Sequence, residues 1–414
     1  MIGGKQADGD APVEQSRVVN ARVKLLGGMF VAAFSGAAWT AEWSVQPTVG
    51  VSVGRDSNPL LVAGAHESAT VTSVTPSMRI QGKTERSNLD LGLVLNYDDY
   101  VSDQVEDTDR QVLSFNSFSQ SSERTRLGLS GEFRRDDLRK IVDSVAGVDG
   151  GGDSDIGLIQ TKVTRTRRSL RPSWTRSVTE LSSVQLSYNV TDVDFANAAG
   201  TGLVDYSDQS LAFTYSRNVS PRDSFNVTTS GSRYRASAID NSTDTTRLLV
   251  GFARAFSETS RGSISIGASK TKEDVAGSID YSSGFVLEAS AKEFSEIMQL
   301  DGTINHDVSP SGIGRSIQSD RLRLRLVRGL TPKTSFSLRA TLLRNEVLEG
   351  SDPTVDRRYY EVEAALDYQW TQQWFFRSAY VYRSQKFDVD PTSAISGAVY
   401  LGVAYNWERQ FFGR

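Results

Sequence analysis

Few residues in this chain of 414 amino acids could support catalysis. There is no cysteine, and His66 and His306 are its two histidines, which excludes most thiol, zinc-finger and imidazole chemistry. No lipase, P-loop, dinucleotide-binding or zinc-protease motif is present. His306 and Asp307, with Ser309 or Ser311 close by, form the one combination of hydrolase residue types. Because no nucleophile stands out beside either histidine, we predict neither an enzyme nor a bound metal or cofactor.

Two groups of arginines are stronger candidates for a functional surface. In both groups the arginines alternate with apolar residues, which in an extended strand places them on one face. They are Arg321, Arg323 and Arg325, and Arg165, Arg167 and Arg171, with Arg168 interrupting the second series. Such a basic face could attract anionic solutes or a polysaccharide that carries uronic acids. The alternative, which we favour, is that the arginines pair with acidic side chains on other strands.

The longest expected connection, residues 140–157, is rich in glycine and carboxylates. Asp149, Asp153 and Asp155 could bind calcium, but the spacing of an EF-hand and its final glutamate are absent. A solvated surface loop is the simpler interpretation. If this loop folded inward, it would narrow a pore.

The arginines require extended strands to hold them, and an alternation of apolar and polar residues recurs from Trp43 onward. A period of two sustained this often predicts an all-β chain with its strands in one closed or layered sheet. The apolar faces use every second residue of 43–53, 89–97, 184–190, 211–215, 248–252, 322–326, 336–342 and 360–370. In a membrane barrel the arginines must face the lumen, because one arginine toward lipid costs about 2–4 kcal/mol at mid-bilayer.

Connections of two kinds alternate between the predicted strands. Short turns lie at residues 83–88, 120–125, 177–180, 218–223, 257–261, 294–296, 330–334 and 371–373. Longer connections lie at residues 55–68, 101–109, 140–157, 196–208, 237–244, 274–280, 307–319, 348–356 and 388–395. This alternation predicts an antiparallel barrel of about eighteen strands with both termini at the short-turn end. A propeller fits less well, because its blades pack four strands into a similar length.

The composition and the first residues indicate export. Hydrophobic residues make up 38% of the chain, and no apolar run approaches the roughly 20 residues of a spanning helix. Residues 1–41 resemble an export signal, with basic residues at 17, 22 and 24, an apolar stretch at 25–34 and small residues at 35–38. Residues 42–414 would then form the barrel. The net charge of −4 argues against nucleic acid as a partner.

The last predicted strand, residues 396–407, has the pattern of a lipid-facing strand. Val399, Leu401 and Val403 share one face, and we assign Gly397 and Tyr400 to the other. The C-terminal signal of bacterial outer-membrane barrels is similar to a pattern made here by Tyr400, Gly402, Tyr405 and Trp407. This resemblance implies that the barrel assembly machinery recognises the chain.

Three short segments resemble one family of outer-membrane porins. Residues 46–58 followed by 74–77, residues 171–174 and residues 330–333 are similar to segments of BBP2-like β-barrel porins. The resemblance spans roughly Trp43 to Trp407. It implies an outer-membrane barrel of the kind often associated with exopolysaccharide or exosortase systems, and it assigns no binding residue.

Together these observations predict a monomeric outer-membrane barrel that passes a hydrophilic solute, with exopolysaccharide export as the implied role. Barrels of this size leave an aqueous lumen. The expected partners are outer-membrane lipid, the assembly machinery, and a polysaccharide or its periplasmic export proteins. Two alternatives remain open. One is a surface barrel that transports nothing and acts as an adhesin or assembly scaffold, and the other is a secreted β-sandwich array.

Overall fold

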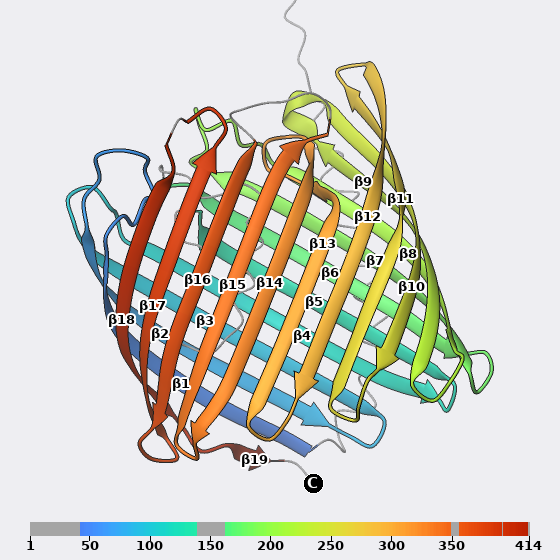
Figure 1. Ribbon diagram of the computed structural model, residues 1–414, viewed down its shortest axis with the longest axis horizontal. Coiled ribbons are helices and arrows are strands. Elements are labelled where there is room, and N and C mark those ends of the chain that lie inside the picture. The colour runs from blue at the N-terminus through green and yellow to red at the C-terminus, as the bar shows by residue number, and fades with distance from the viewer. Residues whose placement is uncertain (1–41, 139–161, 349–355, 391, 413–414) are drawn as a thin grey trace, which may run out of the picture.

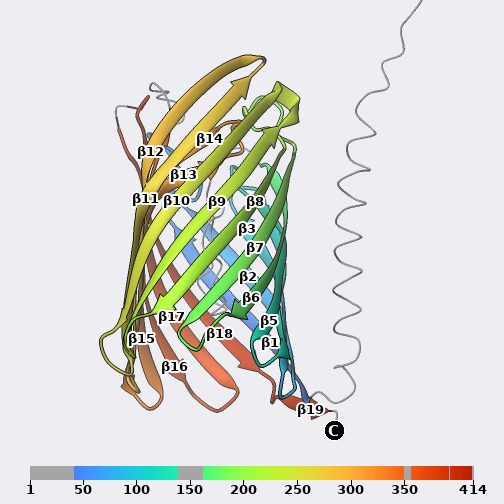
Figure 2. The same cartoon turned by 90° about the vertical axis from the view of Figure 1, so that its right-hand side faces the viewer.

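The chain forms one closed barrel of antiparallel strands. A computed structural model describes residues 42–138, 162–348, 356–390 and 392–412. Eighteen strands follow one another around a single sheet, and β18 pairs with β1 to close it. Figures 1 and 2 show the resulting cylinder of tilted strands. The predicted fold class and strand number are confirmed. The expected export signal, residues 1–41, and the loop at 140–157 lie outside the described residues.

The strands are 13 to 17 residues long, whereas about 9–11 residues suffice for a tilted strand to cross a membrane. They therefore extend beyond the bilayer. Their bounds are β1 Glu42–Asp56, β2 Ala69–Lys83, β3 Ser87–Val101, β4 Thr108–Ser122, β5 Thr125–Asp137, β6 Thr164–Ser177, β7 Ser182–Ala196, β8 Tyr206–Asn218, β9 Asp223–Ala236, β10 Asn241–Ala255, β11 Ser260–Val275, β12 Ser278–Phe294, β13 Met298–Pro310, β14 Ser316–Thr331, β15 Thr334–Val347, β16 Arg357–Gln369, β17 Trp374–Phe387 and β18 Ala394–Asn406. A short strand, β19 (Gln410–Phe412), pairs with the lower end of β1.

Side chains alternate between the two faces of the wall, as the period of two predicts. On β3, Leu95 and Tyr97 are exposed outside, while Asn96 and Asp98 are buried inside. The assignment of Gly397 to the face of Tyr400 is wrong, because Gly397 lies two residues from Val399 and so shares its outer face.

The short turns lie at one end of the barrel and the longer connections at the other (Figure 1). Three predicted long connections are wrong in extent. Ala276 and Gly277 alone join β11 to β12, residues 237–240 join β9 to β10 through a 3-10 turn at Ser237–Ile239, and residues 311–315 join β13 to β14. Ala276 and Gly277 both have positive φ, 50° and 88°, as the type I′ turn of a two-residue hairpin requires. No helix among the described residues is long and apolar enough to span a membrane.

A buried polar cluster fixes the closure of the barrel. Asp56 of β1 accepts hydrogen bonds from Arg383 of β17 and from Ser396 Oγ of β18, the second at 2.5 Å. The side chains of Asp56 and Arg383 are each 5% exposed. Three strands therefore meet at one ion pair next to the seam between β18 and β1.

Candidate functional site: the lumen and its outer mouth

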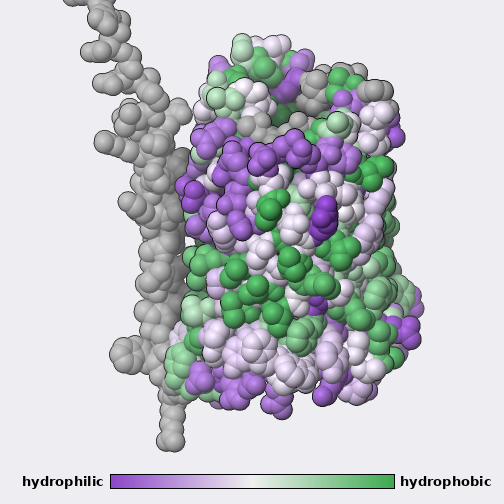
Figure 3. Space-filling model, turned by 90° about the vertical axis from the view of Figure 1, so that its left-hand side faces the viewer, coloured by the Kyte–Doolittle hydropathy of each residue, from purple (hydrophilic) through white to green (hydrophobic). Residues whose placement is uncertain are grey.

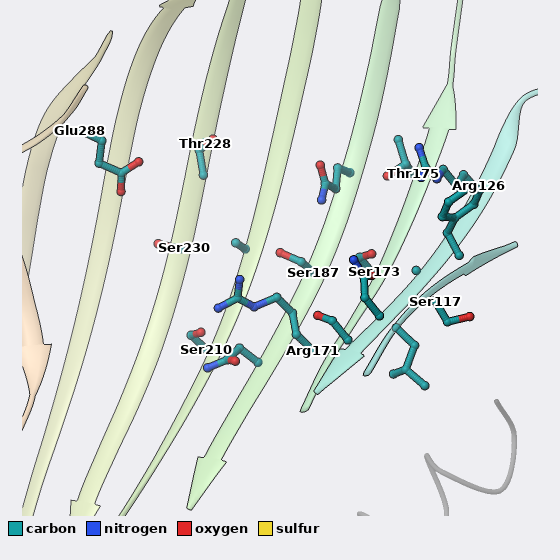
Figure 4. Close-up of a pocket in the computed structure, with 18 of the residues that line it drawn as sticks. Ser117, Arg126, Arg171, Ser173, Thr175, Ser187, Ser210, Thr228, Ser230 and Glu288 are labelled. Carbon is teal, nitrogen blue, oxygen red and sulfur yellow. The ribbon is translucent and has the colours of Figure 1, made fainter. Parts of the chain in front are cut away.

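The inner face of β3 to β12 is lined mainly by small neutral polar side chains. They border a cavity of about 820 Å³ that reaches toward the short-turn end, shown in close-up in Figure 4. Its lining includes Asn116, Ser130, Ser173, Ser187, Asn189, Ser210 and Thr228. Hydroxyl and side-chain amide groups both donate and accept hydrogen bonds. The wall is therefore suited to a solute covered with hydroxyl groups.

Arg171, one of the predicted pore residues, projects from β6 into this cavity (Figure 4). It forms no hydrogen bond or ion pair with the described residues. Glu288 of β12 brings a carboxylate to the same cavity. The Arg126 guanidinium, in contrast, stacks over the Phe118 ring at 3.9 Å from its centroid. Within the described chain, Arg171 is thus a cation in the lumen that is available to a solute.

The other arginines of β6 are placed differently. Arg165 faces inward and is buried in an ion pair with Asp136, with Nη2 and Oδ2 2.8 Å apart. Arg167 lies on the same face and has interaction partners of its own. Arg168 faces outward, where it pairs with Asp194 at 2.5 Å. Arg168 therefore interrupts the series in the sequence because it lies on the outer face, whereas Arg165 and Arg167 lie on the inner face.

Arg321, Arg323 and Arg325 lie on the inner face of β14, and all three have interaction partners. Next to them runs a set of ion pairs from β15 to β17. Arg377 is 2.5 Å from Glu363 and 3.0 Å from Asp367, and Arg339 is 4.0 Å from Glu363. This side of the lumen carries acids close to its arginines, which fits the pairing alternative.

The acidic residues that balance the charge of this wall were not among those predicted from the sequence. Glu361 and Glu363 alternate with Val362 and Ala364 on β16, so the same period that singled out the arginines also marks these acids. The hydroxyl wall was missed too. Its signal is the Ser or Thr that stands between the apolar residues of many strands, such as Ser173 and Ser187.

The upper end of β13 separates from β12, whereas β14 stays paired with β15 up to Ile317 opposite Val347. β12 pairs with β13 only from Leu287 opposite His306 down to Phe294 opposite Gln299, so in the described chain residues 278–286 have no partner on that side. β13 and β14 remain paired with each other up to Pro310 and Ser316. Figure 1 shows β12 continuing upward while the upper part of β13 turns away from it. We call residues 307–316, which are paired with neither β12 nor β15, the inward hairpin.

Polar contacts attach the inward hairpin to the inner face of β9, β10 and β11. Tyr234 Oη donates to the Ser311 carbonyl, and Asn241 Nδ2 donates to the Gly314 carbonyl, both at 2.7 Å. Arg247 Nε lies 2.9 Å from Asp307 Oδ1. Arg247 Nη2 also donates to the Val308 carbonyl at 2.5 Å.

The tip of the inward hairpin packs closely. The Val204 amide donates to the Gly312 carbonyl at 2.8 Å, and Ile313 packs against a cluster of Leu138, Val163 and Leu203. Gly314 has φ +85°, and a Cβ there would stand 2.3 Å from Ile239. In the part of the chain that the structure describes, this hairpin narrows the outer mouth, a role that the sequence suggested for residues 140–157.

A second connection also folds inward. Leu61, in the connection between β1 and β2, is 3% exposed and packs against Leu343, Tyr359 and Ala394 on the inner face of β15, β16 and β18. Asn58 holds this turn by donating to the carbonyls of Val62 and Ile395, at 2.9 Å and 3.1 Å. The outer mouth is therefore narrowed from two sides.

The hydrolase combination is not assembled. His306 faces outward, where its Nδ1 contacts Asp320 and its Nε2 is 2.7 Å from Gln318 Nε2. Asp307 faces inward and pairs with Arg247. Adjacent residues of a strand point to opposite faces, so the barrel wall separates His306 from Asp307.

The outer face carries a continuous apolar band. Figure 3 shows it between more polar zones above and below. Leu211, Val250 and Leu401 are each more than half exposed, and water-soluble monomers rarely expose apolar surface on this scale. A closed barrel with such a band satisfies every backbone group within itself and presents only apolar side chains to acyl chains. The chain is an outer-membrane β-barrel.

Aromatic rings border the band near the short turns. The ring of Tyr405 lies 4.9 Å from that of Trp374, at a tilt of 60°, and 4.8 Å from that of Trp407 in an edge-to-face contact. The rings of Trp370 and Phe376 are 5.9 Å apart. Rings of this kind mark a membrane interface. Within the proposed C-terminal signal, Tyr405 and Trp407 therefore belong to this outer girdle, while Tyr400 and Gly402 lie on the inner face.

No protein-family model matches the sequence, and no curated protein matches it. Several solved structures match the chain at low sequence identity. OccAB2 of Acinetobacter baumannii has 10% identity and a TM-score of 0.44, covering 88% of this chain and 98% of that one. OccK9 (OpdG) of Pseudomonas aeruginosa has 12% identity and a TM-score of 0.44 with the same coverage. The FrpB iron transporter of Neisseria meningitidis (F5-1 variant, apoprotein form) has 9% identity and a TM-score of 0.48, covering 88% and 81%.

Proposed function

We propose that the barrel is a pore for a hydrophilic acidic carbohydrate, and that this carbohydrate is an exopolysaccharide leaving the cell. The observation that carries the proposal is the cavity of about 820 Å³ with its hydroxyl and amide lining and with Arg171, which no described residue pairs. Sugar hydroxyls can exchange hydrogen bonds with such a lining at any position. A uronate carboxylate matches the fork of a guanidinium group.

The distribution of polar groups also suits movement rather than tight binding. Conduction requires many weak sites, so that a solute enters and then leaves. Neighbouring strands supply similar hydroxyl groups to the cavity, among them Ser173, Ser187 and Ser210. A sugar chain could therefore slide from one group to the next. The resemblance to BBP2-like porins agrees with this role, and periplasmic export proteins at the short-turn end remain a prediction.

The test is ion selectivity and block in planar bilayers. The wild-type pore should prefer anions, and a uronic-acid oligomer should block it at lower concentration than a neutral oligosaccharide of equal length. Arg171→Ala should weaken block by the uronic-acid oligomer about tenfold, the equivalent of one charge-assisted hydrogen bond. Arg168→Ala is the matched control, because Arg168 faces outward and pairs with Asp194. Cation preference, or equal block by the two oligomers, would contradict the proposal.

The two inward connections favour one alternative, a barrel that transports nothing and serves as a surface scaffold. Leu61 and Ile313 both fill space at the outer mouth. The scaffold would be supported if folded wild-type protein conducts no ions in planar bilayers and a variant without residues 311–315 conducts none either.

A further inference from the structure

We propose that the inward hairpin, residues 307–316, is a gate with two docking positions, hinged on the part of β14 that stays paired with β15. One is the inner face of β9 to β11, where the structure places it. The other is the free upper edge of β12, where it would complete the barrel wall. This inference rests on the proposed pore, since a gate requires a conducting lumen.

The second position is defined by the upper edge of β12, which is free among the described residues. An unpaired strand edge presents N–H and C=O groups that another strand can bind. The ladder between β12 and β13 stops at Leu287 and His306, although both strands continue. Extending the same register sets Val286 opposite Asp307 and Ser283 opposite Pro310. β13 can therefore extend its existing ladder without a shift in the lower part of the barrel.

The two positions use different partners for the same hairpin. In the inner position, side chains of Tyr234, Asn241 and Arg247 donate to its backbone carbonyls. In the outer position, the backbone of β12 would take over part of this role. The hairpin would exchange hydrogen bonds to side chains of β9 and β10 for hydrogen bonds to the backbone of β12. The inner and outer positions can therefore be close in free energy, as an element with two stable positions requires.

Opening the gate would change the charge of the lumen as well as its width. Arg247 lines the cavity that also contains Arg171, and in the inner position it is paired with Asp307. When the hairpin moves out, Arg247 loses its ion pair with Asp307 and, among the described residues, keeps only the weaker electrostatic interaction with Asp208, so it can bind an acidic solute. An acidic solute that binds Arg247 competes with Asp307, so it favours the open position, and opening in turn favours binding of the solute.

The test uses disulfide trapping in the full-length chain, which has no native cysteine. Val204→Cys with Gly312→Cys should lock the inner position, because the backbones of these residues are hydrogen-bonded at 2.8 Å. Ser283→Cys with Pro310→Cys should trap the outer position. Each single-cysteine variant is a control. Gel mobility first selects the barrels that are folded, and mass spectrometry then detects the cross-link in them. Conductance is measured before and after a reductant is added.

We expect both pairs to cross-link. The inner lock should lower single-channel conductance, with recovery in reductant, and the outer trap should raise it. A uronic-acid oligomer should speed formation of the outer cross-link and slow formation of the inner one. Tyr234→Phe combined with Asn241→Ala should also speed the outer cross-link, because both side chains hold the tip inside.

Failure of the outer pair to cross-link in folded barrels would overturn the proposed movement, whatever the conductance. Equal conductance in the two locked forms would overturn the gate while leaving the pore. If both cross-links form but all bilayers stay silent, the pore fails and the gate fails with it.

Discussion

At the scale of single residues, the register between β5 and β6 decides which arginine of the lumen carries an ion pair. Alternation alone places Arg165, Arg167 and Arg171 on one face and Arg168 on the other. Which arginine is paired depends on the register with β5, because Asp136 stands opposite Arg165 whereas Ser130 stands opposite Arg171. The spacing of these residues in the sequence does not indicate which acidic side chain stands opposite which arginine. The availability of Arg171 therefore emerged only with the structure.

Gly54 tests the packing around the C-terminal strand. A Cβ at Gly54 would stand 2.2 Å from the Tyr400 ring and 3.0 Å from the Val399 carbonyl, so Gly54→Ala must displace the ring. We expect a loss of about 1–3 kcal/mol in the free energy of unfolding, measured by urea titration in lipid vesicles. Gly231→Ala is the control, because a Cβ there has no neighbour within 4 Å. Equal stability of the two variants would show that the Tyr400 ring does not pack tightly against Gly54.

At the scale of elements, the sequence predicts strands well where they cross the membrane. There one face meets acyl chains and the other the lumen, so the period of two is strong. Above the membrane both faces meet water and the period is lost, which is why residues 274–280 were predicted as a loop although most of them belong to β11 and β12. The inward position of the hairpin was not predicted for the same reason. Its residues are mainly polar, and a polar sequence does not indicate which surface a segment contacts.

The seam between β18 and β1 offers a test at this scale. Arg383→Met leaves the buried Asp56 carboxylate without its cation, and breaking a buried ion pair in this way costs about 3–5 kcal/mol. We expect Arg383→Met barrels to unfold at clearly lower urea concentration in lipid vesicles. Arg233→Met should change stability by less than about 1 kcal/mol, because its pair with Asp244 is exposed. A similar loss in both variants would mean that the ion pair does not hold the closure together.

At the scale of the whole molecule, the strand number followed from the alternation of short and long connections. Each pair of strands returns the chain to the short-turn end, so counting turns gives the barrel size without knowledge of any side-chain contact. The interior could not be predicted in the same way. The hydroxyl wall, the ion pairs of β14 to β17 and the narrowed mouth all depend on strands that are distant in sequence and adjacent only after closure.

The central claim is that this outer-membrane barrel encloses a water-filled passage. Single-channel recording of the purified, folded wild-type chain in planar bilayers tests it most directly. We predict stepwise ion currents, and larger currents from the Ser283→Cys, Pro310→Cys variant once its disulfide holds the hairpin outward. Bilayers that remain silent, with protein shown to be folded and inserted, would contradict the account.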